Sequence, residues 1–531
     1  MVFSLGLTRS LKAAAALDRA REAKREEERI DLAYSMAIWP FHIGTTPSFF
    51  IAAYLNHITG ASLAILGLVS TAARIFDAIY NPIVGALSDK TRSRFGRRKP
   101  WVLVGATCML VTLAVGIFAL PTKPTGFSAW WFFGGLVVLF ASWTTAQVPF
   151  NAHAGEFTKD YDRRSRINLQ QSVVGIVASL VTYLVPYLLV DPDLLWLRKG
   201  FTDLLPHISF FQGLTNWLLA SGQVGVANYG RVMVCLAWLI ILSSPILIWR
   251  YLRLVPEPAI IEDAPVAGKS ARSSMGAMVL PLRNRPFLIF CLGYLIFIAG
   301  FVGRLSLYPF IVPYALGGGY SFLLLMQIQG ITGILAAPVW SKIFLKFERG
   351  QILMLASAIE AIGLVLLGLS THGMPYLSLI GSFVCGLPGA TVMMVPYLVA
   401  SESADFSRLK NGGDTRGLHV GIIGLIGKIG NFLATMGLAL AGLLGFNPSH
   451  GVTSHDVVII KWLGLYGPAI LIMIGGAVMM TFPITRLRHR TIQTRLDQRA
   501  HRHGRLIEID PQPLPPLPGL PETPGLIEVK P

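Results

Sequence analysis

Residues Asn81–Pro100, NPIVGALSDKTRSRFGRRKP, join two strongly apolar segments through a short basic loop. Six of these residues are Lys or Arg, and the chain continues directly into the apolar segment WVLVGATCMLVTLAVGIFAL at 101–120. Basic loops between apolar segments mark the cytoplasmic side of a membrane. This stretch therefore predicts two membrane-spanning helices that are joined on the cytoplasmic side.

The composition of the 531-residue chain indicates an apolar solvent. Hydrophobic residues make up 53% of the sequence, charged residues only 14%, and the mean hydropathy is +0.58. A water-soluble protein of this length could not hide so much apolar surface, whereas bilayer hydrocarbon accommodates it. The net charge of +17 does not indicate nucleic-acid binding, because Lys and Arg cluster in short loops and in both tails.

The cysteines do not suggest a metal or disulfide site. All four lie in apolar segments, without paired spacing and without a CxxC motif: Cys108, Cys235, Cys291 and Cys385. We interpret them as small core residues. No nucleotide loop and no nucleophile–base set stands out, so we expect no metal, no cofactor and no enzymatic activity.

About twelve segments are long and apolar enough to cross a bilayer, for which a helix needs roughly 20 residues. They lie near 33–55, 61–88, 101–120, 129–152, 168–190, 230–252, 286–311, 321–344, 351–370, 376–400, 418–445 and 463–484. The loops after the second, fourth, eighth and tenth segments are rich in Lys and Arg, whereas the odd-numbered loops carry few. This alternation predicts cytoplasmic N- and C-termini, and we expect the inner membrane of a bacterial cell.

The chain divides into two six-span halves with polar flanks. We expect a cytoplasmic amphipathic segment lying along the membrane (1–32), an N-terminal half (33–252) with an outside loop (191–229), a cytoplasmic linker (253–285), a C-terminal half (286–486) and a basic, proline-rich disordered cytoplasmic tail (487–531). The PxxP spacing in the tail is a weak signal for a protein partner.

An internal repeat supports the division into two halves. QVPFNAHAGEF (147–157), which ends the fourth segment, is echoed by MVPYLVASESADF (394–406), which ends the tenth. Related loops six spans apart are expected when a half-transporter has been duplicated.

Three polar residues share one face of the second predicted helix. Arg74, Asp77 and Asn81 are spaced i, i+3, i+7. Charge at this depth in hydrocarbon is costly, and by default it marks a transported solute, proton or ion. We therefore take Asp77 as the candidate for a carboxylate that loads and unloads a cation. The alternative is a structural Arg–Asp pair inside the bundle.

Lys428 lies inside the eleventh predicted span, GIIGLIGKIGNF (421–432), without a nearby acid in the sequence. Its partner must come from another helix, and Asp77 in the other half is the obvious candidate. Weaker candidates for contact with a solute or cation are Gln147 and Asn151, which could instead link helices, and Arg304, which could instead face the outer interface. Glu360 is expected to be a structural partner of another polar group.

A second charged group is predicted in the loops. Asp89 and the arginines Arg94, Arg97 and Arg98 can form an ion-pair latch between helix ends that holds one access state closed. The repeated ends of the fourth and tenth segments and the following loop add three residues to this gating set: Glu156, Glu402 and Arg416. The alternative is charge that only orients the chain in the membrane.

Three stretches carry a resemblance to a known family: RIFDAIYNPIVGALSDKTRSRFGRRKPW (74–101), VPFNAHAGEFTKDYDRRSRINLQQ (148–171) and VPYLVASESADFSRLKNGGDTRG (395–417), the last followed by a lysine in the next helix. Together they resemble the glycoside–pentoside–hexuronide:cation symporters, the melibiose-carrier-like branch of the major facilitator superfamily. The resemblance covers most of residues 33–484.

The resemblance implies roles for two residues and contains two departures. Asp77 matches a family carboxylate important for sugar and cation binding, and Lys428 matches the family lysine near the cation site. Asn81 stands where melibiose-type carriers have a second aspartate for the cation. The first span, YSMAIWPFHIGTTPSFF (34–50), lacks the acidic residue that helps those carriers bind sugar. These departures favour a proton over sodium as the coupling cation.

The sequence thus predicts an all-α membrane protein with a twelve-helix major-facilitator fold. We expect it to move a small organic solute, a sugar or glycoside, by alternating access coupled to a cation. Two alternatives stay open: a lipid or amphiphile carrier on the same fold, and a membrane sensor or assembly factor that transports nothing. The expected partners are the solute, the cation and the lipid bilayer.

Overall fold

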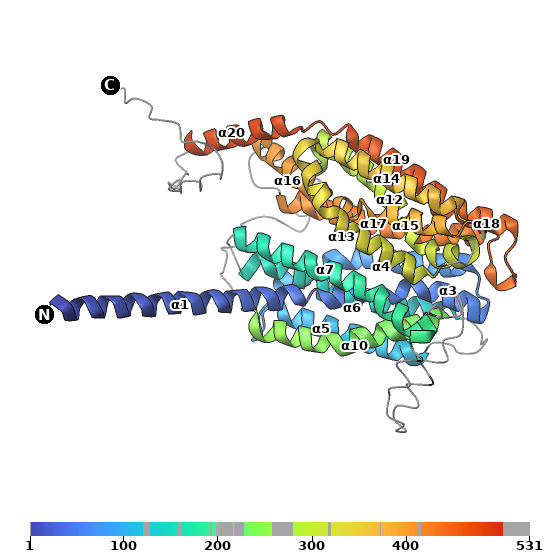
Figure 1. Ribbon diagram of the computed structural model, residues 1–531, viewed down its shortest axis with the longest axis horizontal. Coiled ribbons are helices and arrows are strands. Elements are labelled where there is room, and N and C mark those ends of the chain that lie inside the picture. The colour runs from blue at the N-terminus through green and yellow to red at the C-terminus, as the bar shows by residue number, and fades with distance from the viewer. Residues whose placement is uncertain are drawn as a thin grey trace.

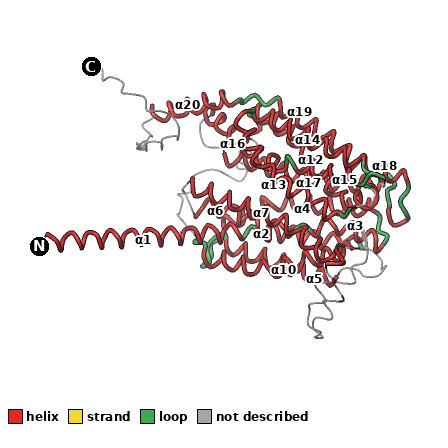
Figure 2. The backbone as a smooth tube through the Cα atoms, in the orientation of Figure 1, coloured by secondary structure: helices red, strands yellow, loops and turns green. Residues whose placement is uncertain are grey.

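The computed structural model is helical almost throughout, and no strand occurs among the residues that it describes (Figure 2). Those residues are 2–119, 128–157, 161–191, 194–197, 199, 216, 228–257, 280–316, 320–371, 373–411 and 416–502. A helix satisfies its backbone hydrogen bonds internally, which bilayer hydrocarbon demands of any spanning segment. Most of the predicted outside loop and linker, and the tail from residue 503 onward, lie outside the described residues.

The helices of the N-terminal half match the first six predicted spans. The first span comprises the end of α1 (Val2–Met36), α2 (Trp39–Ile43) and α3 (Pro47–Thr59). It is followed by α4 (Leu63–Lys90), α5 (Lys99–Ala119), α6 (Ala129–Phe157), α7 (Tyr161–Val190) and α10 (Tyr229–Leu254).

The C-terminal half follows the same order. It contains α12 (Arg285–Ala315), α13 (Phe322–Lys346), α14 (Arg349–Leu369), α15 (Tyr376–Gly386), α16 (Gly389–Asn411) and α17 (Arg416–Leu443). The last span is α18 (Ser454–Lys461), a π-helical turn (Trp462–Tyr466) and α19 (Gly467–Met480). Helix α20 (Arg486–Arg502) comes after it.

Ten described helices are individually long and apolar enough to cross a membrane, and the two remaining predicted spans are broken. The first span is interrupted between α1, α2 and α3, where Pro40 and Pro47 lie in the first turns of the short helices. The tenth is interrupted between α15 and α16 at Leu387–Pro388. Proline lacks the N–H that continues a helix, so each break has a local cause. Counting both broken spans, the predicted twelve-span architecture in two halves is confirmed.

The two halves are in contact at only one end of α4 and α17 among the described contacts. We call this the far end; α1 and α20 project from the opposite end, near the basic loop 91–98, which we call the basic end (Figure 1). At the far end the backbones approach so closely that a Cβ added to Gly67 would lie 2.2 Å from the Ala439 nitrogen. Nearer the middle, Thr71 Oγ1 and Thr435 Oγ1 are 3.1 Å apart.

Other pairs of helices repeat this pattern at the far end. Asn56 Nδ2 donates to Asn447 Oδ1 at 3.0 Å, and Tyr229 donates to the Pro309 carbonyl at 2.8 Å. Gln327 of α13 donates to the Leu180 carbonyl of α7 at 2.5 Å. Among the described residues, the hydrogen bonds between the two halves thus lie in the part of the bundle nearer the far end. The halves separate toward the basic end (Figure 1).

The expectation that residues 1–32 lie along the membrane stays a prediction; from Val2 onward they belong to helix α1. It runs straight out of the bundle, continuing the direction of the first span (Figure 1). Charges of both signs occupy every side of residues 21–29, so the segment offers no apolar stripe to a bilayer. Its base is fixed instead by ion pairs: Arg163 Nη2 of α7 lies 2.8 Å from Asp31 Oδ1.

The start of the predicted disordered tail, residues 487–502, lies in helix α20, whereas the prediction for residues 503–531 falls outside the described residues. Ile492 is buried and Leu496 packs on the same apolar cluster, one helical turn apart. On α16, Asp405 accepts a hydrogen bond from Gln493 at 2.6 Å and lies 3.2 Å from His489 Nε2. This hydrogen-bonded contact with Asp405 raises the pKa of His489. Local apolar spacing and one buried acid therefore order these residues.

Candidate functional site

Asp77 lies at the point where the contact between the two halves ends. It sits in the middle of α4 and is 5% exposed. Lys428 of α17 places its Nζ 3.0 Å from Asp77 Oδ2, and the Thr144 hydroxyl of α6 donates to Asp77 Oδ1. The structure therefore contains the ion pair across the halves that the sequence suggested, and each carboxylate oxygen has a donor.

The Lys428 ammonium lies over the face of an aromatic ring. Its side chain is 18% exposed, and its Nζ lies 5.7 Å from the centre of the Trp143 ring. The indole nitrogen of Trp143 donates to the Phe41 carbonyl at 2.9 Å, which links α6 to the short helix α2. An ammonium over an indole face is stabilised electrostatically. Trp143 therefore fixes the position from which Lys428 reaches Asp77.

Arg74 lies one turn before Asp77 and faces α6. Its guanidinium stacks 4.1 Å from the centre of the Phe140 ring. The group formed by Arg74, Asp77 and Lys428 therefore carries two positive charges and one negative charge when all three are ionised. Protonation of Asp77 would leave two cations without a counter-charge in this group, a costly arrangement away from water.

Three predicted polar residues lie near the ion pair with unused hydrogen-bonding groups. Asn81 on α4 and Gln147 on α6 are half-buried, and Asn151 on α6 is exposed. No side-chain hydrogen bond of these three occurs among the described residues. All three follow Asp77 or its partner Thr144 in the direction of the basic end, where the halves are apart. They can offer amide groups to a polar solute that enters from that end.

Arg304 is not brought to the Asp77 group. It is 3% exposed inside the C-terminal half, where its Nη1 lies 2.8 Å from Glu360 Oε1 on α14. The same nitrogen donates to the Tyr308 hydroxyl at 3.2 Å. The expectation that Glu360 has a polar partner is thus met by Arg304. The two charges bind α12 to α14 within the C-terminal half.

The predicted latch forms within one half. Asp89 Oδ1 at the end of α4 lies 2.6 Å from Arg98 Nη2 at the start of α5. Arg98 also donates from Nη1 to Ser88 Oγ at 2.7 Å and from its backbone N–H to Glu257 Oε1 at 2.6 Å. Arg98 therefore joins α4 and α5 of the N-terminal half to the beginning of the predicted linker after α10.

The other gating candidates have different surroundings. Arg94 is exposed and lies over the Phe95 ring, and Arg97 is half-buried. In the C-terminal half, Glu402 Oε1 lies 3.0 Å from Arg349 Nε. The side chains of Glu156 and Arg416 lie outside the described residues, so their role in gating stays a prediction.

Sequence reasoning missed Thr144, which contacts Asp77 directly. A hydroxyl inside an apolar helix is common and usually bonds to its own backbone, so no pattern singles this residue out. Only the packing of α6 against α4 places its hydroxyl on the carboxylate. In the described part of the chain, no group of three or more His, Cys, Asp or Glu side chains is arranged to hold a metal ion.

Comparison with known proteins matches this architecture to transporters. A family model described as MFS/sugar transport protein matches residues 35–486. The chain is 23% identical to an uncharacterised symporter from Synechocystis, over 85% of this chain and 93% of that protein. It is 18% identical to a glucuronide carrier homologue from Escherichia coli, over 86% and 93%.

Lipid transporters and solved structures match as well. A sphingosine-1-phosphate transporter from Xenopus tropicalis is 23% identical over 90% of this chain and 93% of its own length. Among solved structures, a bacterial homologue of the human lysosomal transporter Spinster superposes with a TM-score of 0.56 at 15% identity, covering 88% of this chain and 98% of that one. At this identity the superposition shows the fold alone.

Proposed function

This chain belongs to the MFS/sugar transport protein family, and we propose that it carries a sugar or glycoside across the membrane together with a proton. Membership makes it an integral membrane transporter of the major facilitator superfamily. The observation that supports the finer proposal is the ion pair between Asp77 and Lys428. Its two partners belong to different halves, so relative motion of the halves makes or breaks it.

The arrangement of the seam suggests how access alternates. The halves touch along the far parts of α4 and α17, and of the hydrogen bonds and ion pairs described between these two helices, Asp77–Lys428 lies nearest the basic end. With the basic end in the cytoplasm, as its arginines and lysines favour, this state would admit solute from the cytoplasm. Rocking of one half against the other would open the far end and close the basic end.

Protonation of Asp77 would couple the proton to this motion. The ionised carboxylate attracts Lys428 and keeps the α4–α17 seam closed. A neutral carboxyl loses most of that attraction, and two unbalanced cations then favour separation of the halves. A solute held by Asn81, Gln147 and Asn151, with Trp143 as a platform for its ring, would bind where the proton acts.

The donor set around Asp77 favours a proton over a metal cation. One carboxylate oxygen already accepts from the Lys428 ammonium and the other from Thr144. A sodium ion would need several oxygen ligands, yet Asn81 supplies an amide where a second carboxylate would serve it better. A proton needs only one oxygen of Asp77.

The test is concentrative uptake into proteoliposomes under an imposed pH gradient. We expect Asp77→Asn to abolish uphill accumulation while leaving downhill exchange of the solute, because the variant resembles a permanently protonated site. Asp456→Asn is the matched control, since Asp456 in the first turn of α18 accepts hydrogen bonds from the N-cap residue Thr453, and an asparagine side-chain oxygen can accept them as well. Full accumulation by Asp77→Asn would reject the assignment.

The solute itself is found by a thermal-shift screen of the purified protein against sugars, glycosides, uronates and lysolipids. The relation to a sphingosine-1-phosphate transporter supports one second candidate, an amphiphile carrier on the same fold. Lysolipid competition, together with uptake that a proton uncoupler does not change, would favour that candidate.

A further inference from the structure

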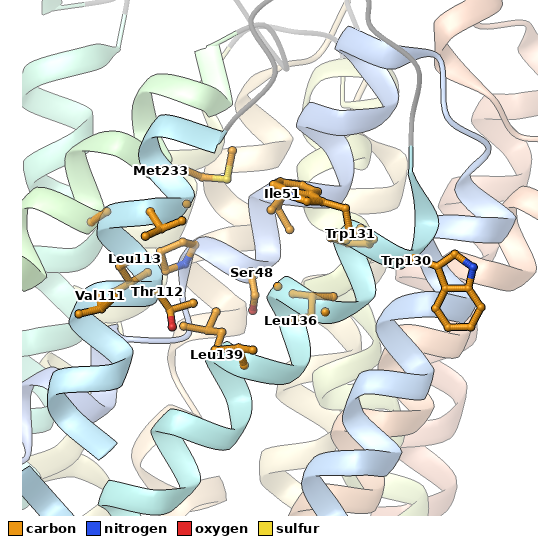
Figure 3. A pocket seen from close by; sticks show the side chains of 18 residues that line it. Ser48, Ile51, Val111, Thr112, Leu113, Trp130, Trp131, Leu136, Leu139 and Met233 are labelled. Atoms are coloured by element: carbon orange, nitrogen blue, oxygen red, sulfur yellow. The ribbon is translucent and has the colours of Figure 1, made fainter. Parts of the chain in front are cut away.

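An apolar cavity of about 570 Å³ lies in the N-terminal half, outside the Asp77 group. It is formed by the far-end parts of α3, α5, α6 and α10, with side chains of α5 and α6 facing each other across it (Figure 3). None of the charged or amide residues of the candidate site lines it. The transport path between the halves therefore does not explain this cavity.

The hydroxyl groups in the cavity lining already donate their hydrogens to backbone carbonyls. Among its described residues only Ser48 and Thr112 carry hydroxyl groups. Ser48 donates to the Thr45 carbonyl at 2.6 Å, and Thr112 donates to the Cys108 carbonyl at 2.7 Å. The lining contains no charged side chain. Apart from the indole N–H groups of Trp130 and Trp131, the lining offers no donor to replace the hydrogen bonds that a sugar makes to water.

The lining also offers few partners to water, because a buried water molecule needs two to four polar groups. The surrounding helix faces are apolar and exposed, with Val115 60% and Val111 56% exposed, so in a membrane they meet hydrocarbon. An unfilled void would forfeit dispersion contacts along its whole lining. The one substance at hand that matches this chemistry is an alkyl chain.

Two tryptophans mark one end of the cavity. Trp130 is 83% exposed and Trp131 is 45% exposed, both in the first turn of α6. Tryptophans with an apolar ring and a polar N–H gather at the headgroup level of membranes. A chain entering from the bilayer would therefore have its headgroup beside this tryptophan pair.

Three glycines widen the cavity. At Gly116, Gly134 and Gly135 an added Cβ would have no atom within 4 Å. Glycine weakens a helix by about 1 kcal/mol relative to alanine, so close packing is the usual reason for it in a membrane helix. Among the described residues no atom lies within 4 Å of a Cβ added at any of these three, so the space beside them is open to a ligand.

We propose that this cavity is a binding site for one acyl chain of a resident bilayer phospholipid, with the headgroup at Trp130 and Trp131. The position of the cavity on the outside of one half, rather than between the halves, makes the chain a structural companion and not the cargo. The site would hold the outer surfaces of α5 and α6 together while the halves move.

The experiment uses the full-length protein in phospholipid nanodiscs that contain a phosphatidylcholine with a diazirine on one acyl chain. After irradiation, adducts are mapped by mass spectrometry. We expect them to be enriched on peptides covering 111–116 and 130–139 relative to other lipid-facing helices. Gly135→Phe fills the cavity and should reduce these adducts several-fold. Gly437→Phe, where an added Cβ also meets open space, is the matched control and should leave them unchanged.

Gly116→Leu provides a second filling variant should Gly135→Phe fail to fold. Adducts spread evenly over all lipid-facing helices, or unchanged in both filled variants, would overturn the proposal. A lysophospholipid probe that labels the cavity while the phospholipid probe does not would also overturn it, because the occupant would then be a single-chain amphiphile.

Discussion

Two ion pairs in this protein each join a basic to an acidic side chain inside the helix bundle, but one connects the two halves and the other lies within one half. Asp77–Lys428 joins α4 to α17 across the two halves, with side chains 7% and 18% exposed. Arg304–Glu360 joins α12 to α14 within one half, with side chains 4% and 0% exposed. In the proposed rocking motion the first pair would separate, whereas the second would move with the C-terminal half. Location relative to the seam, and not charge, decides which pair can report a conformational change.

The largest expected effect comes from neutralising each pair in turn. Asp77→Asn with Lys428→Leu should abolish uphill solute accumulation, because the switch between the halves is gone. Arg304→Met with Glu360→Leu should retain it, since a buried ion pair is often replaced by apolar residues without loss. Uptake into proteoliposomes under a pH gradient measures solute accumulation by both double variants. Lost accumulation in a stably folded Arg304/Glu360 double variant would place this pair in the transport machinery.

Removing only one partner of each pair should lower the stability of the protein by different amounts for the two pairs. Arg304→Met leaves Glu360 as an uncompensated charge at 0% exposure and should cost about 3–5 kcal/mol. Lys428→Met should cost less, because Asp77 keeps the Thr144 hydrogen bond and lies nearer the space between the halves. Thermal unfolding of the purified variants makes the comparison, and equal losses would contradict it.

The seam beside Asp77–Lys428 can be pushed apart without touching a charge. Gly67→Ala would place a methyl group 2.2 Å from the Ala439 nitrogen. Overpacking of about 1–3 kcal/mol would shift the balance between the two access states by roughly 5- to 150-fold.

Spin labels at Arg94 and Lys346, exposed near the basic end of each half, report the shift in a background without native cysteines. We expect a larger population with a short distance. Gly437→Ala, which meets open space, should leave the distribution as it is. A distribution that Gly67→Ala does not alter would argue against the seam as the gate.

The smallest effect concerns α20, where a third pair joins His489 to Asp405. The pKa of His489 is raised by its hydrogen bond to Asp405. Its contribution to docking is therefore complete below the ordinary histidine pKa and is lost as the pH rises through the raised value. We expect about 1 kcal/mol or less. Protection factors of the α20 amides, which remove the intrinsic pH dependence of hydrogen exchange, should fall as the pH rises above the ordinary histidine pKa, and the fall should be smaller in His489→Gln.

Several features of the fold and the candidate site could be predicted because they are local. Apolar runs of membrane length gave the spans, and their ends fall within a few residues of the helices, as for 61–88 and α4. Pro40, Pro47 and Pro388 stood in the sequence at the breaks of the first and tenth spans. Charge inside an apolar run singled out Asp77 and Lys428, because hydrocarbon tolerates it only with a partner.

Tertiary structure alone decided which of these charges meet. From the sequence, Arg304 was grouped with Asp77, yet the packing of α12 on α14 gives it to Glu360. The same non-local packing brings Thr144 to Asp77, confines the Asp89–Arg98 latch to one half and opens the apolar cavity. Periodicity and hydropathy are properties of one helix, whereas each of these contacts depends on how two helices are rotated and placed against each other. The local sequence therefore determines where the helices lie along the chain. The contacts between charged and polar side chains depend on how those helices pack.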